Sequence, residues 1–371
     1  MISAVVLGAA LVNADRSSGT WTGAVEARGN YYWERSTRVF APSLNVTLDA
    51  PNGVRVTGSY LLDMITSASV AAGLVSDVRF TERRHDGSLG LGYEFDLGDP
   101  KLLTTLSGRY SHEPDYDSYS GNFGAQLSLN DRSTVIGLNF NYMHDEVGRI
   151  LRGASRAMGG RDLSNRGKVG TLNHYFLGLS WTQLVTPVLY FELGYDLTYQ
   201  NGFQANTYRT VAVSGVPFAE NHPRERLRNA LYGKLAYYFR PTRTAIHALY
   251  RTYIDSWDIV ALTPEVRIFQ EVTDLATLRF RYRYYTQTNA YFQNDPSEYH
   301  LGDTYVTADP KMTRFHSHLV GGQVMLKMDF LQDTALAFAA DSSIDFSFDY
   351  IWNTNRFGDG VIAQAGLRVP F

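Results

Sequence analysis

The sequence of 371 residues contains no cysteine, so disulfide bonds, thiolate metal sites and cysteine nucleophiles are excluded together. A chain without cysteine also suits passage through an oxidising periplasm in the unfolded state. There is no run of about 18 apolar residues after the N-terminus, which excludes a bundle of membrane-spanning helices. Proline is scarce, with 12 residues, whereas Tyr (25), Phe (20) and Gly (32) are abundant.

No charge of one sign dominates. The formal net charge is −3, which gives no argument for a nucleic-acid partner. There is no glycine-rich phosphate loop, nucleotide fingerprint or haem-attachment motif, and we therefore expect no cofactor. Although 44% of the residues are apolar, the mean hydropathy is −0.23. A membrane barrel gives such an average because its lipid-facing apolar residues alternate with polar residues that face the lumen.

The first residues, MISAVVLGAALVNA, have the apolar stretch and small-residue spacing of the end of a secretory signal, but they lack a basic region. We interpret residues 1–14 as the remnant of a truncated signal peptide. A genuine periplasmic N-terminal segment is the alternative. Residues 15–371 are expected to form a single domain.

Alternation of apolar and polar residues with a period of two runs through the rest of the chain and predicts strands. Residues 87–97 place Leu, Leu, Tyr, Phe and Leu on one face and small or acidic residues on the other. About sixteen such segments occur, an even number, as bacterial single-chain barrels require. They lie near 21–33, 36–49, 53–65, 85–97, 101–113, 117–129, 133–146, 170–185, 187–200, 227–241, 243–257, 261–272, 275–289, 313–330, 342–354 and 359–371.

The connections between these segments alternate between short turns and long loops, as in outer-membrane barrels with short periplasmic turns and long extracellular loops. The long gaps lie near 66–84, 147–169, 201–226 and 290–312, and the connection 331–341 is expected to hold a short helix. The fold predicted is an all-β, transmembrane, antiparallel up-and-down barrel of the bacterial outer membrane. A soluble β-sandwich is the alternative, but it does not need aromatic residues at strand ends, where girdles sit. Those aromatic residues are Trp181, Tyr190, Tyr199, Tyr237, Tyr250 and Trp352.

The polar faces of the predicted strands would line the lumen. Arg279, Arg281 and Arg283 alternate with apolar residues and form a ladder that points inward. The ladder is on about the thirteenth strand, nearly half a turn from Glu94 and Asp96 on about the fourth, and this arrangement predicts a transverse field. The other inward charged residues predicted are His247, Arg251, Asp255, Arg267, Glu271, Lys234, Asp345 and Asp349.

These charges have two interpretations. They form a selectivity region or a docking surface for a plug, or they are paired charges that simply keep a wide lumen wet and rigid. Large inward residues would narrow the channel or support a guest. They are Phe176, Tyr190, Tyr232, Tyr238, Tyr253, Phe269 and Tyr285.

Other candidate sites are weaker. His316 and His318 share one strand face at the outer rim, but two ligands do not define a metal site, and we expect none. Acidic loop residues suit either divalent cations that bridge lipopolysaccharide or plain solvation. His174 and His112 are expected to be isolated, with no serine partner that the sequence identifies, so no catalytic residue is predicted. The acidic loop residues are Glu113, Asp115, Asp117, Asp145 and Glu146.

The last strand ends with Leu367, Val369 and Phe371 at alternate positions. This pattern resembles the C-terminal signal that the barrel-assembly machinery recognises, although Pro370 departs from it. Proline is tolerated there if its N–H is not needed by the strand ladder.

The chain as a whole resembles an uncharacterised outer-membrane barrel family of the "domain of unknown function" type. The resemblance covers residues 21–371 and is carried by Gly29-Asn30-Tyr31-Tyr32, by Asp345-Phe346-Ser347-Phe348-Asp349-Tyr350 and by the closing Gly366-Leu367-Arg368-Val369-Pro370-Phe371. Members of this family are often encoded beside a small lipoprotein, a thioredoxin-like protein and a flavin transferase, which implies a link to envelope redox chemistry.

Two functional hypotheses follow. In the first, the barrel is a porin-like channel for small polar or charged solutes, without enzymatic activity. In the second, it is a non-conducting scaffold that holds a periplasmic or lipoprotein partner, with a role in electron transfer. In both, the expected partners are outer-membrane lipids, lipopolysaccharide and the assembly machinery, with no nucleic acid.

Overall fold

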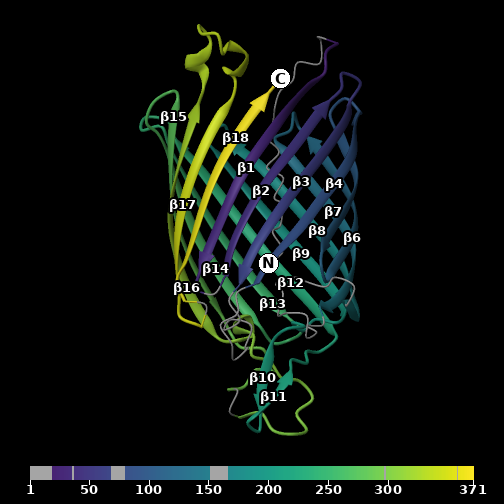
Figure 1. Cartoon of the computed structure of the whole chain (residues 1–371). Coiled ribbons are helices and arrows are strands. Elements are labelled where there is room, and N and C mark those ends of the chain that lie inside the picture. Colours follow the sequence, from purple (N-terminus) through teal and green to yellow (C-terminus); the bar gives the residue numbers. More distant parts are fainter. Residues whose placement is uncertain (1–18, 36, 68–79, 151–165, 296–297, 357) are drawn as a thin grey trace.

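The computed structural model describes residues 19–35, 37–67, 80–150, 166–295, 298–356 and 358–371. Sixteen long strands form one closed antiparallel barrel, in which β1 pairs with both β2 and β18 (Figure 1). This confirms the predicted fold class. The predicted signal-peptide remnant at residues 1–14 lies outside the described residues. No described helix is long and apolar enough to cross a membrane.

Each predicted segment corresponds to one barrel strand. The first eight are β1 (Thr22–Glu34), β2 (Thr37–Asp49), β3 (Val54–Ser67), β4 (Phe80–Asp96), β5 (Lys101–Glu113), β6 (Tyr116–Leu129), β7 (Thr134–Ile150) and β8 (Arg166–Thr186). The others are β9 (Leu189–Gly202), β12 (Glu225–Phe239), β13 (Thr244–Asp255), β14 (Val260–Glu271), β15 (Ala276–Gln287), β16 (Phe315–Lys327), β17 (Ser343–Asn353) and β18 (Gly360–Pro370).

The outer face of the barrel is apolar. Leu89 and Leu91 on β4 are 74% and 60% exposed, and the same alternation runs around the whole barrel. Because the apolar side chains point outward, the polar residues between them face the lumen. Most of the predicted girdle residues lie on this outer face, but Tyr190 does not: its ring lies 4.9 Å from the ammonium of Lys234, an inner-face residue, so its assignment to the girdle was wrong.

The connections β2–β3, β4–β5, β6–β7, β8–β9, β12–β13 and β14–β15 are short and lie at the end of the barrel where the chain terminates (Figure 1). The opposite end carries long loops but also the short connections 114–115 and 256–259, so the predicted alternation of short turns with long loops is only partly correct. The turn between β6 and β7 has three successive non-glycine residues at positive φ, Asn130, Asp131 and Arg132, and Asn and Asp tolerate this conformation. The connection between β16 and β17 contains the 3-10 helices η6 (Asp329–Leu331) and η7 (Ala337–Ala339), which confirms the short helix expected there.

The opposite end carries a structure that the sequence did not predict. Part of the loop 203–224 folds into a hairpin of β10 (Thr210–Val213) and β11 (Val216–Ala219), and the loop 288–314 contains η5 (Pro310–Met312). The backbones of Asn221 and Val306 exchange hydrogen bonds of 3.1 and 3.0 Å, which join the two loops. We call the two loops together the cap.

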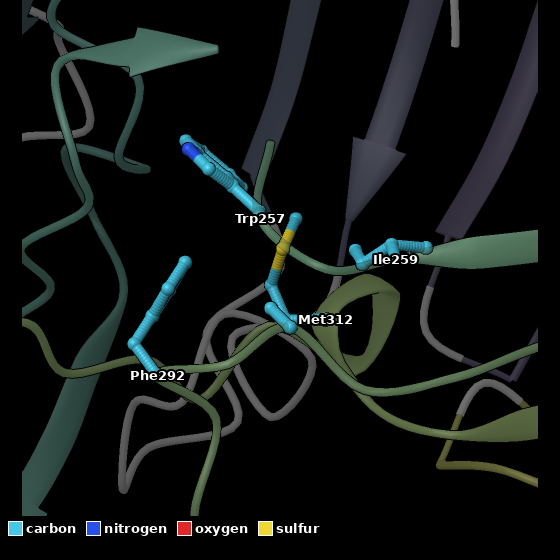
Figure 2. Packing of buried hydrophobic residues seen from close by; sticks show 5 residues of the cluster. Trp257, Ile259, Phe292 and Met312 are labelled. Carbon is cyan, nitrogen blue, oxygen red and sulfur yellow. The ribbon is translucent and has the colours of Figure 1, made fainter. Parts of the chain in front are cut away.

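The cap has its own apolar core. Trp257 and Ile259, from the β13–β14 turn, gather with Ala290, Phe292 and Met312 (Figure 2). A second cluster joins Val211 and Val213 of β10 to Tyr299 and Val306. Burial of these side chains from water orders both loops at the mouth of the barrel.

The C-terminus closes the barrel against β1. Phe371 and Gly23 exchange two backbone hydrogen bonds, of 2.8 and 2.9 Å. Pro370 pairs in register with Ala24. This pair is next to the hydrogen-bonded pair of Gly23 and Phe371, and in an antiparallel ladder such a neighbouring pair exchanges no backbone hydrogen bonds. Its nitrogen therefore faces β17, whose pairing with β18 ends at Arg368, so the missing N–H costs no ladder bond.

Candidate functional site

The inner face of the barrel is the candidate site. The predicted ladder occupies β15, which is the thirteenth strand of the ring. Phe280 and Tyr282 are 58% and 47% exposed on the outside, so Arg279, Arg281 and Arg283 point into the lumen. Strand β4, with Glu94 and Asp96, lies seven strands away through the β1–β18 closure.

Arg281 and Asp349 form the most buried ion pair of the ladder. The Arg281 Nε donates to Asp349 Oδ1 at 2.7 Å, and a second guanidinium nitrogen bonds to Oδ2. The side chain of Asp349 is fully buried. Strand β16 lies between the two residues, and there Gly321 leaves the space for them to meet, because a Cβ at that position would come 1.7 Å from Asp349 Oδ1.

Other predicted lumen residues on this wall are also paired. Arg267 donates through Nε to Glu265, and Lys234 lies 3.9 Å from Glu192. The aromatic ring of Phe269 lies 4.7 Å from that of His247. Near the end of the barrel opposite the cap, Glu271 accepts from Arg243 Nε at 3.0 Å. Asp345 accepts from Gln323 at 2.8 Å and lies 3.4 Å from Arg28.

Asp255 accepts several hydrogen bonds at the capped end of the same wall. Its Oδ2 accepts from Arg226 Nε at 2.8 Å and from the Tyr253 hydroxyl at 2.6 Å. Its Oδ1 accepts from the backbone N–H groups of Trp257 and Ile259, at 2.9 and 3.0 Å. Arg226 also lies over the Trp257 ring, 4.0 Å from its centroid. One carboxylate thus ties β12, β13 and the cap together.

The opposite wall is richer in carboxylates. Asp86 accepts from Arg109 Nε at 2.8 Å, and Asp63 is paired with Arg84. Glu94 lies 3.4 Å from Arg132 in a turn. Asp96 is exposed at the end of β4, where it accepts from the Gly98 N–H at 3.0 Å.

The inner face is polarised across the barrel. The alternation places eight Arg or Lys side chains and three carboxylates inward on β12–β15: Arg226, Arg228, Lys234, Arg251, Arg267, Arg279, Arg281 and Arg283 against Asp255, Glu265 and Glu271. Strands β1–β9 reverse this balance among the described side chains, with eleven carboxylates and six cations. These are Glu26, Glu34, Asp49, Asp63, Asp86, Glu94, Asp96, Glu113, Asp145, Glu192 and Asp196 against Arg28, Arg55, Arg84, Lys101, Arg109 and Arg149.

His174 is not isolated, which corrects the expectation drawn from the sequence. Its Nε2 lies 2.8 Å from Asp145 Oδ2, and its Nδ1 accepts from Gln200 Nε2 at 2.7 Å. Asp145 and His174 are both buried, on neighbouring strands β7 and β8. His112 is paired too, with Asp117 at 2.6 Å. The sequence could not reveal these pairs, because which side chains meet depends on the register in which neighbouring strands pair.

His316 and His318 lie on the outer face, as their parity predicts. Their ring centroids are 5.9 Å apart, and the Tyr282 hydroxyl lies 2.8 Å from His318 Nδ1. Of the five acidic residues predicted to lie in loops, only Asp115 does, and it accepts from the hydroxyl of Tyr208 in the cap. The assignment to loops was wrong for the other four, which lie in β5, β6 and β7: Glu113, Asp117, Asp145 and Glu146. Within the described part of the chain, no group of three or more His, Cys, Asp or Glu residues is placed to hold a metal ion.

A buried polar cluster joins the two loops of the cap. Glu220 accepts from the Thr307 hydroxyl at 3.0 Å, and His222 Nε2 lies 3.0 Å from the same oxygen. Arg209 bridges Glu220 and Asp309, at 3.2 and 2.9 Å. Burial lowers the pKa of His222, although the charges of Glu220 and Asp309 oppose that shift. Burial alone would raise the pKa of Asp309, but Arg209 and Lys311 hold it below its ordinary value.

A closed barrel with an apolar outer face and a charged inner face defines the class of protein as an outer-membrane-type β-barrel. The model of the family described as "Protein of unknown function (DUF3570)" matches residues 66–342, and the chain belongs to that family. No curated protein sequence matches the chain.

Several solved structures are similar in form. A mutant of the ferric enterobactin receptor PfeA from Pseudomonas aeruginosa has 12% identity and a TM-score of 0.49, over 91% of this chain and 54% of that one, so this chain spans about half of the receptor. The outer membrane protein OprD from Pseudomonas aeruginosa has 8% identity and a TM-score of 0.45, over 95% and 94%. A BenF-like porin from Pseudomonas fluorescens Pf-5 has 10% identity and a TM-score of 0.47, over 95% and 98%.

Proposed function

We propose that the protein is a channel of the bacterial outer membrane that passes small polar or charged solutes. The observation that carries the proposal is the opposite charge balance of the two inner walls. Fixed charges of opposite sign on facing walls create a transverse field, which orients dipolar solutes and sets ion preference. The proposal assigns no catalytic step to the barrel.

The cationic wall forms a continuous track along the lumen. Arg228 lies opposite Asp255 at the outer end, and Arg279 lies opposite Phe269 near the other end. These two rows meet β13 at Asp255 and Ala245, ten residues apart, which matches the roughly 9–11 residues by which a tilted strand crosses the hydrocarbon core. An anion would therefore meet a cationic side chain at every stage of its passage.

The outer surface supports placement in an outer membrane. Its apolar side chains would contact lipid, and the Tyr and His side chains near the capped end would lie among the headgroups, where lipopolysaccharide is the expected partner. The terminal residues Leu367, Val369 and Phe371 share the outer face by strand parity and would present the signal for the assembly machinery.

A non-conducting scaffold for a periplasmic or lipoprotein partner is the second candidate. The observation in its favour is the cap, because packed loops at the mouth restrict the entry of solutes. Tyr208 of the loop 203–224 reaches Asp115 between β5 and β6, four strands from its own attachment at β9. On this alternative, the charged inner face holds a partner and passes little solute.

Single-channel recording of the refolded barrel in a planar bilayer separates the two functions. A channel gives stable conductance steps with an anion preference. A silent bilayer, for protein whose folding is verified by heat-modifiable gel mobility, overturns the channel proposal and favours the scaffold.

A further inference from the structure

Four arginines of the cationic wall have no carboxylate of their own. Arg228, Arg251, Arg279 and Arg283 form no hydrogen bond or ion pair with any other residue that the structure describes, although Arg226, Arg267 and Arg281 on the same wall are all paired. The Nε atoms of Arg228 and Arg279 are buried and unsatisfied. Leaving a charged donor without a partner in a buried site is costly, so these groups need an explanation.

The nearby carboxylates are already occupied. Asp255 lies opposite Arg228 in the strand register, but its two oxygens accept from Arg226, Tyr253 and two backbone N–H groups. A carboxylate offers about four lone-pair sites, so Asp255 has none left for Arg228. Glu265, opposite Arg283, accepts from Arg267 instead.

Two of these guanidinium groups, those of Arg251 and Arg283, lie in one region of the wall. Arg228 lies three strands and six residues from the row of Glu265 and Arg283, so its Cα atom is about 24 Å from that of Arg283. Arg251 pairs in register with Tyr232 on β12 and with Thr263 on β14. This row lies two residues nearer the capped end of the barrel than the row that contains Glu265 and Arg283. With strands about 4.8 Å apart, the Cα atoms of Arg251 and Arg283 are separated by about 12 Å, a gap that two arginine side chains can close onto one small ligand. Tyr285 lies within electrostatic range of both arginines.

Two tyrosine rings complete the region. The hydroxyl of Tyr253 is committed to Asp255, and that of Tyr285 donates to Gln287 Oε1 at 2.6 Å. Arg251 already lies over the Tyr253 ring, 5.5 Å from its centroid. Because both hydroxyls are occupied, the tyrosines offer ring faces to a ligand, and the arginines offer planar forks that match a carboxylate.

We propose that Arg251 and Arg283, with Tyr253 and Tyr285, form a binding station for small planar carboxylates in the capped half of the lumen. The station rests on the proposed channel function, in which it selects the solute. The guanidinium forks supply charge-assisted hydrogen bonds to the carboxylate, and the rings contact the body of the ligand. Arg281 and Arg279 continue the track toward the periplasm.

The test uses benzoate as the probe, benzamide as its uncharged match and inorganic phosphate as the competing oxyanion. In a planar bilayer, we expect benzoate to block chloride current saturably in the wild type. In R251Q/R283Q, the half-blocking concentration should rise at least about tenfold. The control R38Q/R83Q removes the same charge from exposed positions on the outer face and should behave as the wild type. An unchanged block in the first variant overturns the station and leaves the channel proposal standing.

A second variant tests the planar shape of the guanidinium group separately from its charge. R251K/R283K keeps both charges but loses the planar fork, so it should keep the anion preference and lose benzoate affinity. If benzoate affinity survives in this variant, the assigned recognition is wrong. If phosphate blocks at lower concentrations than benzoate, the carboxylate class is wrong. Folding of every variant is verified by heat-modifiable gel mobility.

Equilibrium dialysis of labelled benzoate against the folded barrel in detergent makes the station testable without conductance. Saturable binding that is lost in R251Q/R283Q supports the station even if the bilayer is silent, in which case only the channel proposal fails. The absence of saturable binding to the wild type overturns the station, whatever the conductance.

Discussion

At the scale of single residues, we expect the buried ion pair of Arg281 and Asp349 to be the part of the lumen most sensitive to substitution. In Asp349→Asn, the Arg281 charge stays in place without its counter-charge. Breaking a buried pair on one side costs about 3–5 kcal/mol, so the urea midpoint of the folded barrel should fall. Arg281→Met/Asp349→Leu removes both charges and should recover much of the loss. A single variant as stable as the wild type would contradict this description of the pair.

Gly321 gives a second prediction at this scale. Gly321→Val places a side chain where Arg281 and Asp349 meet, so it should reduce thermal stability in detergent by breaking the same pair. Gly322, the next residue, faces outward, and a Cβ there would come no nearer than 3.8 Å to another atom. Gly322→Ala is therefore the matched control, and equal losses in both variants would show that the space at position 321 has no special role.

At the scale of elements, the cap should respond to acid. His222 has a pKa below its ordinary value of 6.5, so the folded cap keeps it neutral while the unfolded loop takes up a proton more readily. The contribution to cap stability is full above pH 6.5 and is lost as the pH falls from there toward the lowered pKa. Hydrogen exchange at the amides of Asn221 and Val306, corrected for the intrinsic pH dependence, should therefore accelerate between pH 7 and mildly acidic pH. His222→Gln should abolish that acceleration, and an unchanged pH dependence in this variant would rule out the histidine as its source.

The last strand makes a separate prediction about assembly. Deleting Phe371 removes both the paired hydrogen bonds to Gly23 and the terminal aromatic residue, so the yield of assembled barrel in cells should fall strongly. Pro370→Ala should assemble as the wild type, because the N–H at that position has no ladder partner. The readout is the fraction of heat-modifiable protein in isolated membranes, and equal fractions for the deletion and the wild type would remove the assembly role from Phe371.

The strands could be predicted from the sequence because the period of two is a local property, repeated sixteen times. The cap could not be, because β10 and β11 are short and the hairpin is stabilised by Tyr299 and Val306, which lie far away in the chain. The inward direction of the arginine ladder followed from parity alone. Its pairing did not: Arg281 meets Asp349 across an intervening strand, and only the register reveals that Gly321 leaves them room. Arg228 was missed for a similar reason, since its lack of a partner depends on how Asp255 is occupied.

At the scale of the whole molecule, the barrel has one wall with an excess of cations and a facing wall with an excess of carboxylates. Local ion pairs neutralise part of the charge on the inner face, but each wall keeps its excess of charges of one sign. We therefore expect the charge distribution around the ring of strands to set the ion selectivity, with the anion preference arising from β12–β15.

The most direct test is the reversal potential of single channels in a salt gradient, for the wild type and for Arg279→Ser/Arg281→Ser/Arg283→Ser. We expect an anion-selective wild type and a shift toward cations in the triple variant, because the carboxylates of β1–β9 then dominate the lumen. Conducting channels with the same reversal potential in both proteins would contradict the proposal that the polarised inner walls set the selectivity.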